Sequence, residues 1–361
     1  MISYFEVFGY TMNIVQKTFP ITQWLANYQR AYLPGDLFAG LTVGIMLIPQ
    51  GMAYALIAGL PPVYGLYASI VPQIIYAIFG TSRQLSVAPV AMDSLLVAAG
   101  VSVLATEGTD AYIGFAILLA FFMGAFQLLL GVFRMGFITN LLSKPVISGF
   151  TSAAALIIGI NQLKYLLGTE IEKSNKVYEI LWSAVQKIDE THLITLFIGI
   201  GGIVVIKGAK KIHNNIPGAL IAVAAGTAIV YFFQLHSAGV NIVESIPKGL
   251  PSFQWPQFEL GKISELIPLA LTISVVAFME AFSVAKAIEA KQKNHKVIAN
   301  QELIGLGAAN LIGSLFQSYP VTGGFSRSAV NHQSGAHTPL ASIFSATLIG
   351  LTLLFLTPLF Y

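Results

Sequence analysis

The sequence predicts an all-α protein that crosses a membrane several times. Of its 361 residues, 55% are hydrophobic and only 10% are charged, whereas a soluble domain typically carries about 25% charged residues. Several apolar runs reach the roughly 20 residues that a helix needs to cross the hydrocarbon core. The 33 glycines and 16 prolines are typical of membrane helices that pack closely or are interrupted.

Composition also excludes several classes of function. The chain has no cysteine, which excludes disulfides, thiolate metal sites and cysteine catalysis. Its net charge of +3 reflects the loops of a membrane protein, so no nucleic-acid partner is predicted. No Walker A loop, HExxH motif or GxSxG elbow is present, so neither an enzyme nor an ATP-driven pump is predicted, and no cofactor is expected.

Two patterns suggest sites that we do not expect. The glycines at 305 and 307 resemble part of a dinucleotide loop, but they lie inside an apolar helix with no preceding strand, so close helix packing is expected instead. His332 and His337 have no other metal-ligating residues near them in the sequence. We therefore predict no metal site.

The N-terminal segment, residues 1–36, is expected to lie on the cytoplasmic interface. It places Lys17 and Arg30 among aromatic residues such as Phe8 and Trp24, as in helices that lie in the membrane surface. No cleavable signal is visible.

Apolar periodicity and helix breakers divide the rest of the chain into membrane segments. The expected segments are residues 37–58, 63–79, 88–104 (short), 111–133, 145–167, 193–206, 217–235, 266–287, 297–316, a short one from 326, and 339–356. The polar stretch 168–191 reads as a solvated connector or a surface helix. With the N-terminus inside, the inner loops hold roughly twice as many Lys and Arg residues as the outer loops, which favours this orientation.

An internal repeat relates the two halves. Residues 41–53 align with residues 271–283 at a constant offset of 230, which places Gln50 opposite Glu280. Two spans later, each half has a short segment, one opening at Val87 and the other at Phe325. The repeats begin at the first and eighth spans, so each repeat has seven spans. Because an odd number of spans reverses the direction in which the next repeat enters the membrane, the halves are predicted to be inverted. Paired interrupted segments in inverted repeats mark the midplane site of a transporter.

The polar stretch 317–330 lies between two strongly apolar segments. Pro320 and the glycines at 323 and 324 break helical geometry, and Ser326 is the expected N-cap of a new helix. A helix N-terminus attracts anions, and Arg327 adds a full charge. An arginine at membrane depth is costly and indicates function. We expect the two short segments to be half-helices that meet at mid-membrane with a small anion between their N-termini.

Four stretches closely resemble the sulfate permease (SulP) family. They are Gly-Leu-Thr-Val-Gly at 40–44 through Ile-Pro-Gln-Gly-Met-Ala-Tyr-Ala at 48–55, Gly-Leu-Pro-Pro-Val-Tyr-Gly-Leu-Tyr at 59–67, Gly-Thr-Ser-Arg at 80–83, and Thr-Gly-Gly-Phe-Ser-Arg-Ser at 322–328. The resemblance implies two inverted seven-span repeats, a mobile core, a gate domain, a homodimer, and a cytoplasmic STAS domain. It places the core in residues 37–135 and 263–361 and the gate in 136–262. The sequence ends near the eleventh span, so the second repeat is expected to be truncated, without the last gate spans and the STAS domain.

The expected anion site combines the two half-helix starts with one face of the first span. Gln50 and Tyr54, four residues apart, share a helix face and can donate to an oxyanion. The predicted substrate-binding residues are Gln50, Tyr54, Ala88, Pro89, Val90, Ser326 and Arg327. The alternatives are an ion pair between Arg327 and a carboxylate, and a helix–helix hydrogen bond for Tyr54.

Two carboxylates are candidates for coupling. Glu280 is expensive inside a membrane unless it is protonated or paired, and the resemblance implies that a carboxylate there serves proton or sodium coupling. Asp93 departs from the family, which has small or aliphatic residues at that place. It repels anions, so it is expected to hold a proton or cation, or simply to be paired.

The sequence thus predicts secondary active transport of small oxyanions, sulfate first, by proton symport across the inner or plasma membrane. The alternatives are a sodium-coupled bicarbonate transporter, a dicarboxylate or chloride transporter or exchanger, a nucleobase permease of the same architecture, and a non-transporting membrane protein that binds an anion.

Overall fold

A computed structural model defines the helices of this protein and divides them into two compact units. It describes residues 18–140, 152, 156, 159–160, 162–169, 171, 177–212, 218–242, 249–256, 260–291 and 296–356. The first unit combines Met1–Leu141 with Gly249–Leu354, and the second combines Leu142–Lys248 with Phe355–Tyr361. The assignment of these units to a mobile core and a gate stays a prediction.

The first unit holds both short segments and the helices around them. Its elements are α2 (Ile21–Ala26), η1 (Arg30–Tyr32), α3 (Leu33–Ile57), α4 (Pro62–Tyr67), α5 (Val71–Phe79), β1 (Val87–Ala88), α6 (Ala91–Val101), α7 (Asp110–Val132), η2 (Met135–Asn140), α13 (Leu260–Glu289), α14 (Ala299–Ser314), β2 (Thr322–Gly323), α15 (Phe325–Gln333) and α16 (Leu340–Leu351), which runs into a π-helical turn at η5 (Thr352–Leu356).

The second unit contains helices from the middle of the chain. Its described elements are α9 (Leu163–Leu167), α10 (Val177–Gln186), η3 (Ile188–Glu190), α11 (Leu193–Ile212), α12 (Gly218–Phe232) and η4 (Leu235–Ala238). Large apolar side chains on α11 and α12, such as Phe197 and Phe232, are exposed, as expected of helices that face lipid.

The helices confirm an all-α membrane protein. In the described part of the chain, four segments are long and apolar enough to cross a bilayer, namely Arg30–Ile57, Pro62–Phe79, Asp110–Val132 and Gly261–Glu289. The expected span 63–79 differs in detail, because it is broken into α4 and α5. The break precedes Pro72, which stands in the first turn of α5 and lacks the N–H that a continuous helix would use. The connector 168–191 includes the helix α10, whereas residues 1–17 and most of the span 145–167 lie outside the described residues.

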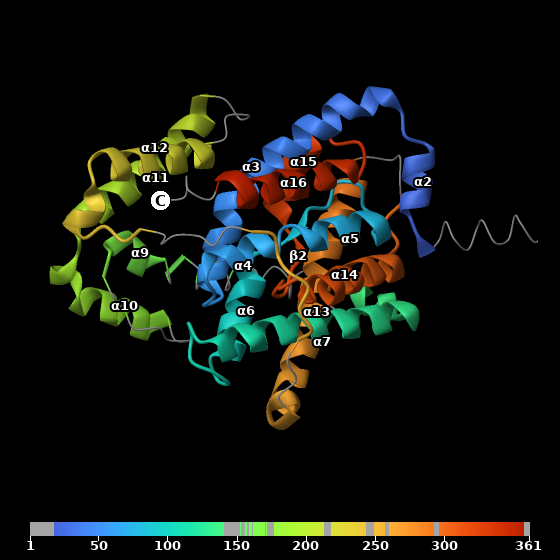
Figure 1. Ribbon diagram of the computed structural model, residues 1–361, viewed down its shortest axis with the longest axis horizontal. Helices are drawn as coiled ribbons and strands as arrows, with labels where there is room; N and C mark the ends of the chain where they lie inside the picture. The colour runs from blue at the N-terminus through green and yellow to red at the C-terminus, as the bar shows by residue number, and fades with distance from the viewer. Residues whose placement is uncertain are drawn as a thin grey trace, which may run out of the picture. The chain divides into compact units, whose positions relative to one another are not determined.

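The packing in the first unit follows the internal repeat (Figure 1). Helix α3 packs against α16, and its counterpart α13 packs against α7, which is the counterpart of α16. Likewise α3 contacts α15 as α13 contacts α6. Equivalent helices thus meet equivalent partners from the other half, as two inverted repeats require.

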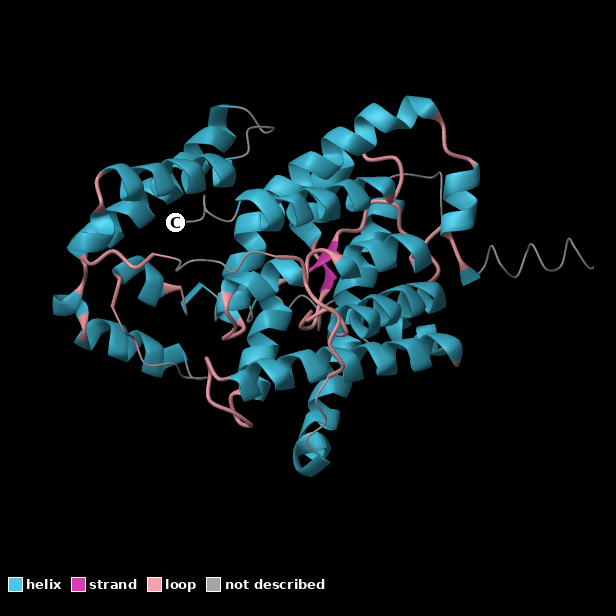
Figure 2. Ribbon diagram, in the orientation of Figure 1, coloured by secondary structure: helices cyan, strands magenta, loops and turns pink. Residues whose placement is uncertain are grey.

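Two short strands lie among these helices (Figure 2). Strand β1 pairs with β2 in antiparallel orientation, with Val87 opposite Gly323 and Ala88 opposite Thr322. Each strand leads directly into a short helix, β1 into α6 and β2 into α15. Two equivalent segments related by a two-fold axis run antiparallel where they pair, so this sheet lies at the junction of the two repeats.

Glycines allow α14 to approach α7 and the end of α5 closely. A Cβ at Gly305 would lie 3.0 Å from the Cα of Gly80, and a Cβ at Gly307 would collide with the backbone N of Leu128. Small residues at helix contacts are the usual means of close packing in membranes. The glycines at 305 and 307 therefore serve packing.

We expect Gly307→Ala to destabilise the protein by about 1–3 kcal/mol, the usual cost of overpacking. The new methyl group would strike the backbone of α7, which cannot move aside as a flexible side chain could. Thermal unfolding of the purified protein in detergent measures the effect. The control is Gly226→Ala on α12, where an added Cβ meets no atom within 4 Å. Equal unfolding midpoints for the two variants would contradict the packing argument.

Candidate functional site

The two half-helices start from opposite ends of the same two-residue sheet, because the strands that lead into them pair in antiparallel orientation. The residues before the helices, Val90 (φ −129°, ψ 153°) and Gly324 (φ −83°, ψ 128°), are extended, and no side chain caps either helix. The first N–H groups of each helix thus have no partner within the helix. Two helix ends with partial positive charge thus point toward this short sheet from its two ends, which favours an anion there.

Arg327 lies in the first turn of α15 and is only 2% exposed. One terminal nitrogen donates to the carbonyl oxygen of Ala88 at 3.2 Å, which joins α15 to β1. Its Nε is buried and makes no hydrogen bond within the described residues. A buried guanidinium thus keeps part of its donor set available beside both helix starts.

Neither candidate carboxylate forms an ion pair with Arg327 among the described residues. Glu280 on α13 and Arg327 influence each other electrostatically, and so do Asp93 on α6 and Glu280. Asp93 is fully buried, and neither of its oxygens has a hydrogen-bond partner in the described part of the chain, nor has Oε2 of Glu280. A permanent ion pair with Arg327, the structural alternative raised by the sequence, is therefore absent among these residues.

The first span contributes Gln50 and Tyr54 from α3. The Oε1 of Gln50 is buried and has no partner among the described residues, and Tyr54 acts electrostatically on both Arg327 and Tyr319. The fully buried Tyr319 shares a hydrogen bond of 3.2 Å with Ser94 of α6. Tyr54 of α3, Glu280 of α13 and Tyr319 before β2 thus lie near Arg327, and Ser94 of α6 joins this group through Tyr319.

The predicted backbone residues of the site occupy the two helix entries. Ala88 pairs with Thr322, and Pro89 and the buried Val90 connect it to α6. The expectation that Ser326 caps the second half-helix is wrong, since Gly324 is the N-cap and Ser326 is an exposed residue within the first turn. Glycine adopts the extended cap geometry at no steric cost, so the helix begins two residues earlier than a cap at Ser326 would allow.

Polar side chains deep in the bundle hold the second strand in place. Asn310 on α14 donates to the carbonyl oxygen of Val321 at 3.0 Å and accepts from its N–H at 2.9 Å. The hydroxyl of Thr322 donates to the carbonyl of Ala277 on α13 at 2.6 Å. On the far side of the sheet, Ser328 accepts the N–H of Ser86 at 2.9 Å. These bonds fix β2, and with it the start of α15.

Sequence reasoning missed Tyr319, Ser94 and Asn310. Tyr319 stands inside the same polar stretch as Arg327, directly before Pro320, so its position was a usable signal. Ser94 and Asn310 carry no such signal, because a single small polar residue inside a membrane helix is common and usually bonds its own helix.

Comparison with known proteins places these features in a family. The model of the sulfate permease family matches residues 33–361. The chloroplastic sulfate transporter 4.1 of Arabidopsis thaliana is 42% identical over 356 residues, and the match covers 96% of this chain and 51% of that protein. The sodium-independent sulfate anion transporter of Bos taurus is 34% identical over 96% of this chain and 62% of its own length.

The solved structure of SLC26A9 superposes with a TM-score of 0.90 at 26% sequence identity, over 97% of this chain and 58% of that one. The chain thus spans between about half and three fifths of the length of these relatives. Their similarity extends across the half-helix junction and the buried arginine. Because the family model covers nearly the whole sequence, the chain belongs to the sulfate permease family.

Proposed function

We propose that the protein carries out secondary active transport of small inorganic oxyanions, with sulfate as the first candidate and a proton as the coupling ion. The family is one of transporters and not of enzymes, and the chain is a multi-pass membrane protein. The anion, the coupling ion, a homodimer, and an inner or plasma membrane location with the N-terminus in the cytoplasm belong to the proposal.

One observation carries the proposal. Arg327 is buried between two uncapped helix starts and has an unused Nε–H. A guanidinium donates in a planar fork that suits an oxyanion, and the free N–H groups of α6 and α15 add further donors. The Arabidopsis thaliana and Bos taurus relatives are sulfate transporters, which supports sulfate as the ion.

The carboxylates supply the coupling in this proposal. With no anion bound, an ionised Glu280 balances the charge of Arg327 at a distance. A dianion that enters would face Glu280 and Asp93 together, which is costly in a buried site. Taking up a proton with the anion removes that cost, and the same linkage makes proton and anion bind more tightly together than apart.

Sulfate uptake into liposomes that contain the protein tests the proposal. With radiolabelled sulfate outside and an inward proton gradient, we expect accumulation above the equilibrium level, which disappears when a protonophore is added. A sodium gradient at equal pH should give none. If accumulation depends on the sodium gradient and not on the proton gradient, sodium replaces the proton as the coupling ion in this scheme.

A second candidate, a nucleobase permease, is favoured by a different observation. The unpartnered acceptors Gln50 Oε1, Asp93 and Glu280 could bind the N–H groups of a neutral base. Calorimetric titration with uracil and with sulfate separates the two. Under the oxyanion proposal sulfate binds and uracil neither binds nor competes, whereas the reverse result would favour the permease.

A further inference from the structure

A cavity lies away from the half-helix junction. It has a volume of about 630 Å³ and is formed where α5 and α7 end and α14 begins, with α2 along one side. Its size falls within the usual range for ligand pockets. Three basic residues from three different segments line it, namely Arg83, Arg134 and Lys296.

The charge of this cavity is unbalanced. Among the described residues that line it, none is Asp or Glu. Basic residues near helix C-termini often bond the last carbonyls of the helix, which would account for Arg83 after α5 and Arg134 after α7. Neither they nor Lys296 makes a side-chain hydrogen bond or salt bridge within the described residues, however. Three like charges around one hollow repel one another unless an anion lies between them.

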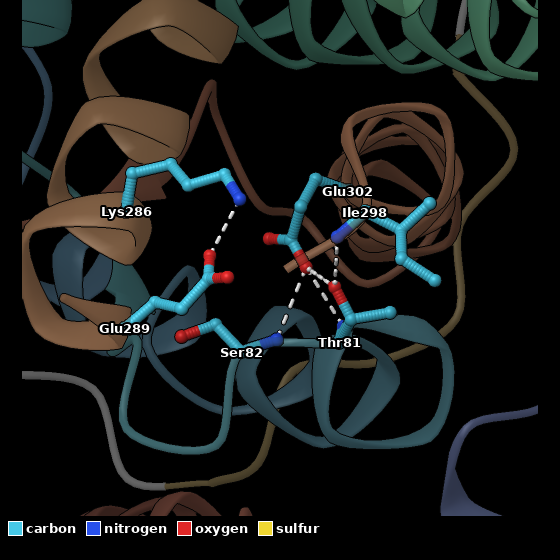
Figure 3. A network of polar contacts seen from close by, with 6 residues as sticks. All are labelled: Thr81, Ser82, Lys286, Glu289, Ile298 and Glu302. Atoms are coloured by element: carbon cyan, nitrogen blue, oxygen red, sulfur yellow. Dashed lines mark hydrogen bonds and ion pairs between the residues drawn. The ribbon is translucent and has the colours of Figure 1, made fainter. Parts of the chain in front are cut away.

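The floor of the cavity is held by a hydrogen-bond network (Figure 3). Glu302 on α14 accepts from the N–H of Thr81 at 2.7 Å, from its hydroxyl at 2.5 Å and from the N–H of Ser82 at 3.1 Å. The N–H of Ile298 in turn donates to the Thr81 hydroxyl at 3.1 Å. The segment that carries Arg83 is thereby fixed to the start of α14.

Glu302 is the carboxylate of the network that holds the cavity floor, and its oxygens already accept hydrogen bonds from other donors. It is fully buried, and beyond the three bonds from Thr81 and Ser82 it accepts the hydroxyl of Tyr76 at 2.5 Å. Four donors spread its charge below the cavity floor.

The rim of the cavity is apolar on one side. Val132 and Ile298, which line it, are 58% and 50% exposed, and Phe133 beside Val132 is 71% exposed. These residues stand at the ends of membrane helices, where the head-group region of a bilayer begins. A ligand with a phosphate and apolar chains would place its charge among the basic residues and its chains along this rim.

We propose that this cavity binds the head group of an anionic phospholipid, with the phosphate among Arg83, Arg134 and Lys296. Basic pockets between membrane helices are suited to such head groups. A lipid is favoured over a free anion, because the cavity opens beside exposed apolar side chains at the level of the membrane surface. By the Lys and Arg distribution, we expect this surface to be the cytoplasmic one.

The experiment measures lipid binding by the purified chain. Phosphatidylglycerol or phosphatidylcholine is added to protein in neutral detergent, and bound lipids are counted by native mass spectrometry while the unfolding temperature is followed. The test variant carries Arg83→Gln, Arg134→Gln and Lys296→Gln. The control carries Arg30→Gln, Lys207→Gln and Lys211→Gln, which removes the same charge from exposed residues on the same expected side.

We expect wild type and control to bind phosphatidylglycerol and to be stabilised by it more than by phosphatidylcholine. The triple cavity variant should lose affinity by on the order of 100-fold, from about 1 kcal/mol per basic residue near the surface. Three changes could disturb folding, so the single variant Lys296→Gln is measured as well. It should show a smaller loss of affinity, of several-fold. Equal phosphatidylglycerol binding by the cavity and control variants would overturn the proposal.

Two further arms identify the source of the anion. Inorganic phosphate and glycerol 1-phosphate should stabilise the protein far less than phosphatidylglycerol at equal concentration, and equal stabilisation would instead mean a site for free phosphate. Arg327→Ala should keep the full response to phosphatidylglycerol, since the half-helix junction is a separate site. Loss of the response in Arg327→Ala would contradict that independence.

Discussion

Replacing Arg327 by alanine is expected to abolish sulfate binding. The change removes the buried guanidinium beside β1 and leaves the anion with the carboxylates Glu280 and Asp93. Removing one partner of a buried charge pair costs about 2–5 kcal/mol. This loss raises the dissociation constant for sulfate by a factor between roughly 30 and 4,000. Calorimetric titration of sulfate into the purified protein measures this loss. Arg30→Ala, which removes the same charge from an exposed position, should bind sulfate as wild type does.

Arg327→Lys should restore binding only in part. Lysine keeps the charge but loses the planar fork, and it would have to choose between the carbonyl of Ala88, to which Arg327 now donates, and the anion. The unfolding temperature is measured alongside, because loss of the Ala88 bond alone could loosen α15. Unchanged sulfate affinity in a well-folded Arg327→Ala variant would place the anion elsewhere.

Glu280→Gln is expected to separate binding from coupling. In wild type, sulfate affinity should rise as the pH falls through the range in which Glu280 titrates, because proton and anion promote each other's binding. Glutamine resembles the protonated acid, so the variant should bind sulfate at neutral pH with little dependence on pH. It should also lose accumulation driven by a proton gradient, although exchange of one anion for another can survive.

The matched control for this variant is Asp93→Asn. Asp93 is buried near Glu280, and its oxygens have no hydrogen-bond partner among the described residues, so the change removes a second carboxyl group from the same region. If Glu280 is the carrier, Asp93→Asn keeps proton-driven accumulation and changes only the affinity. Should Glu280→Gln still concentrate sulfate with a proton gradient alone, the carrier is another group, and loss of accumulation in Asp93→Asn would identify it.

Helix breakers and composition determine the parts of the fold that could be predicted from the sequence. Pro320 and the glycines at 323 and 324 located the interruption, and the repeat located its counterpart at β1. Arg327 drew attention because an arginine is rare in an apolar stretch. These signals are local, so reading them requires no knowledge of which helices meet.

Other features depended on contacts that a sequence does not display. Ser326 was the expected cap because serine suits that position in most helices. The observed cap is Gly324, whose N–H donates to the carbonyl oxygen of Ser86. Likewise, Asn310 holds Val321 across eleven residues, and Tyr319 meets Ser94 across 225. Such partners are set by how the two repeats fit together, and propensity rules for single helices do not contain that information.

The pairing of β1 with β2 has a consequence for the order in which the protein can be made. Arg327 and Ala88, which meet at the junction, are 239 residues apart. At a synthesis rate of about 5–20 residues per second, the first half-helix waits on the order of 10 to 50 s for its partner. During that interval the edge of β1 is an unpaired backbone inside a bilayer, where such groups are costly. We therefore expect a temporary partner, such as the insertion machinery, to cover the edge of β1 until the second half of the chain has been made.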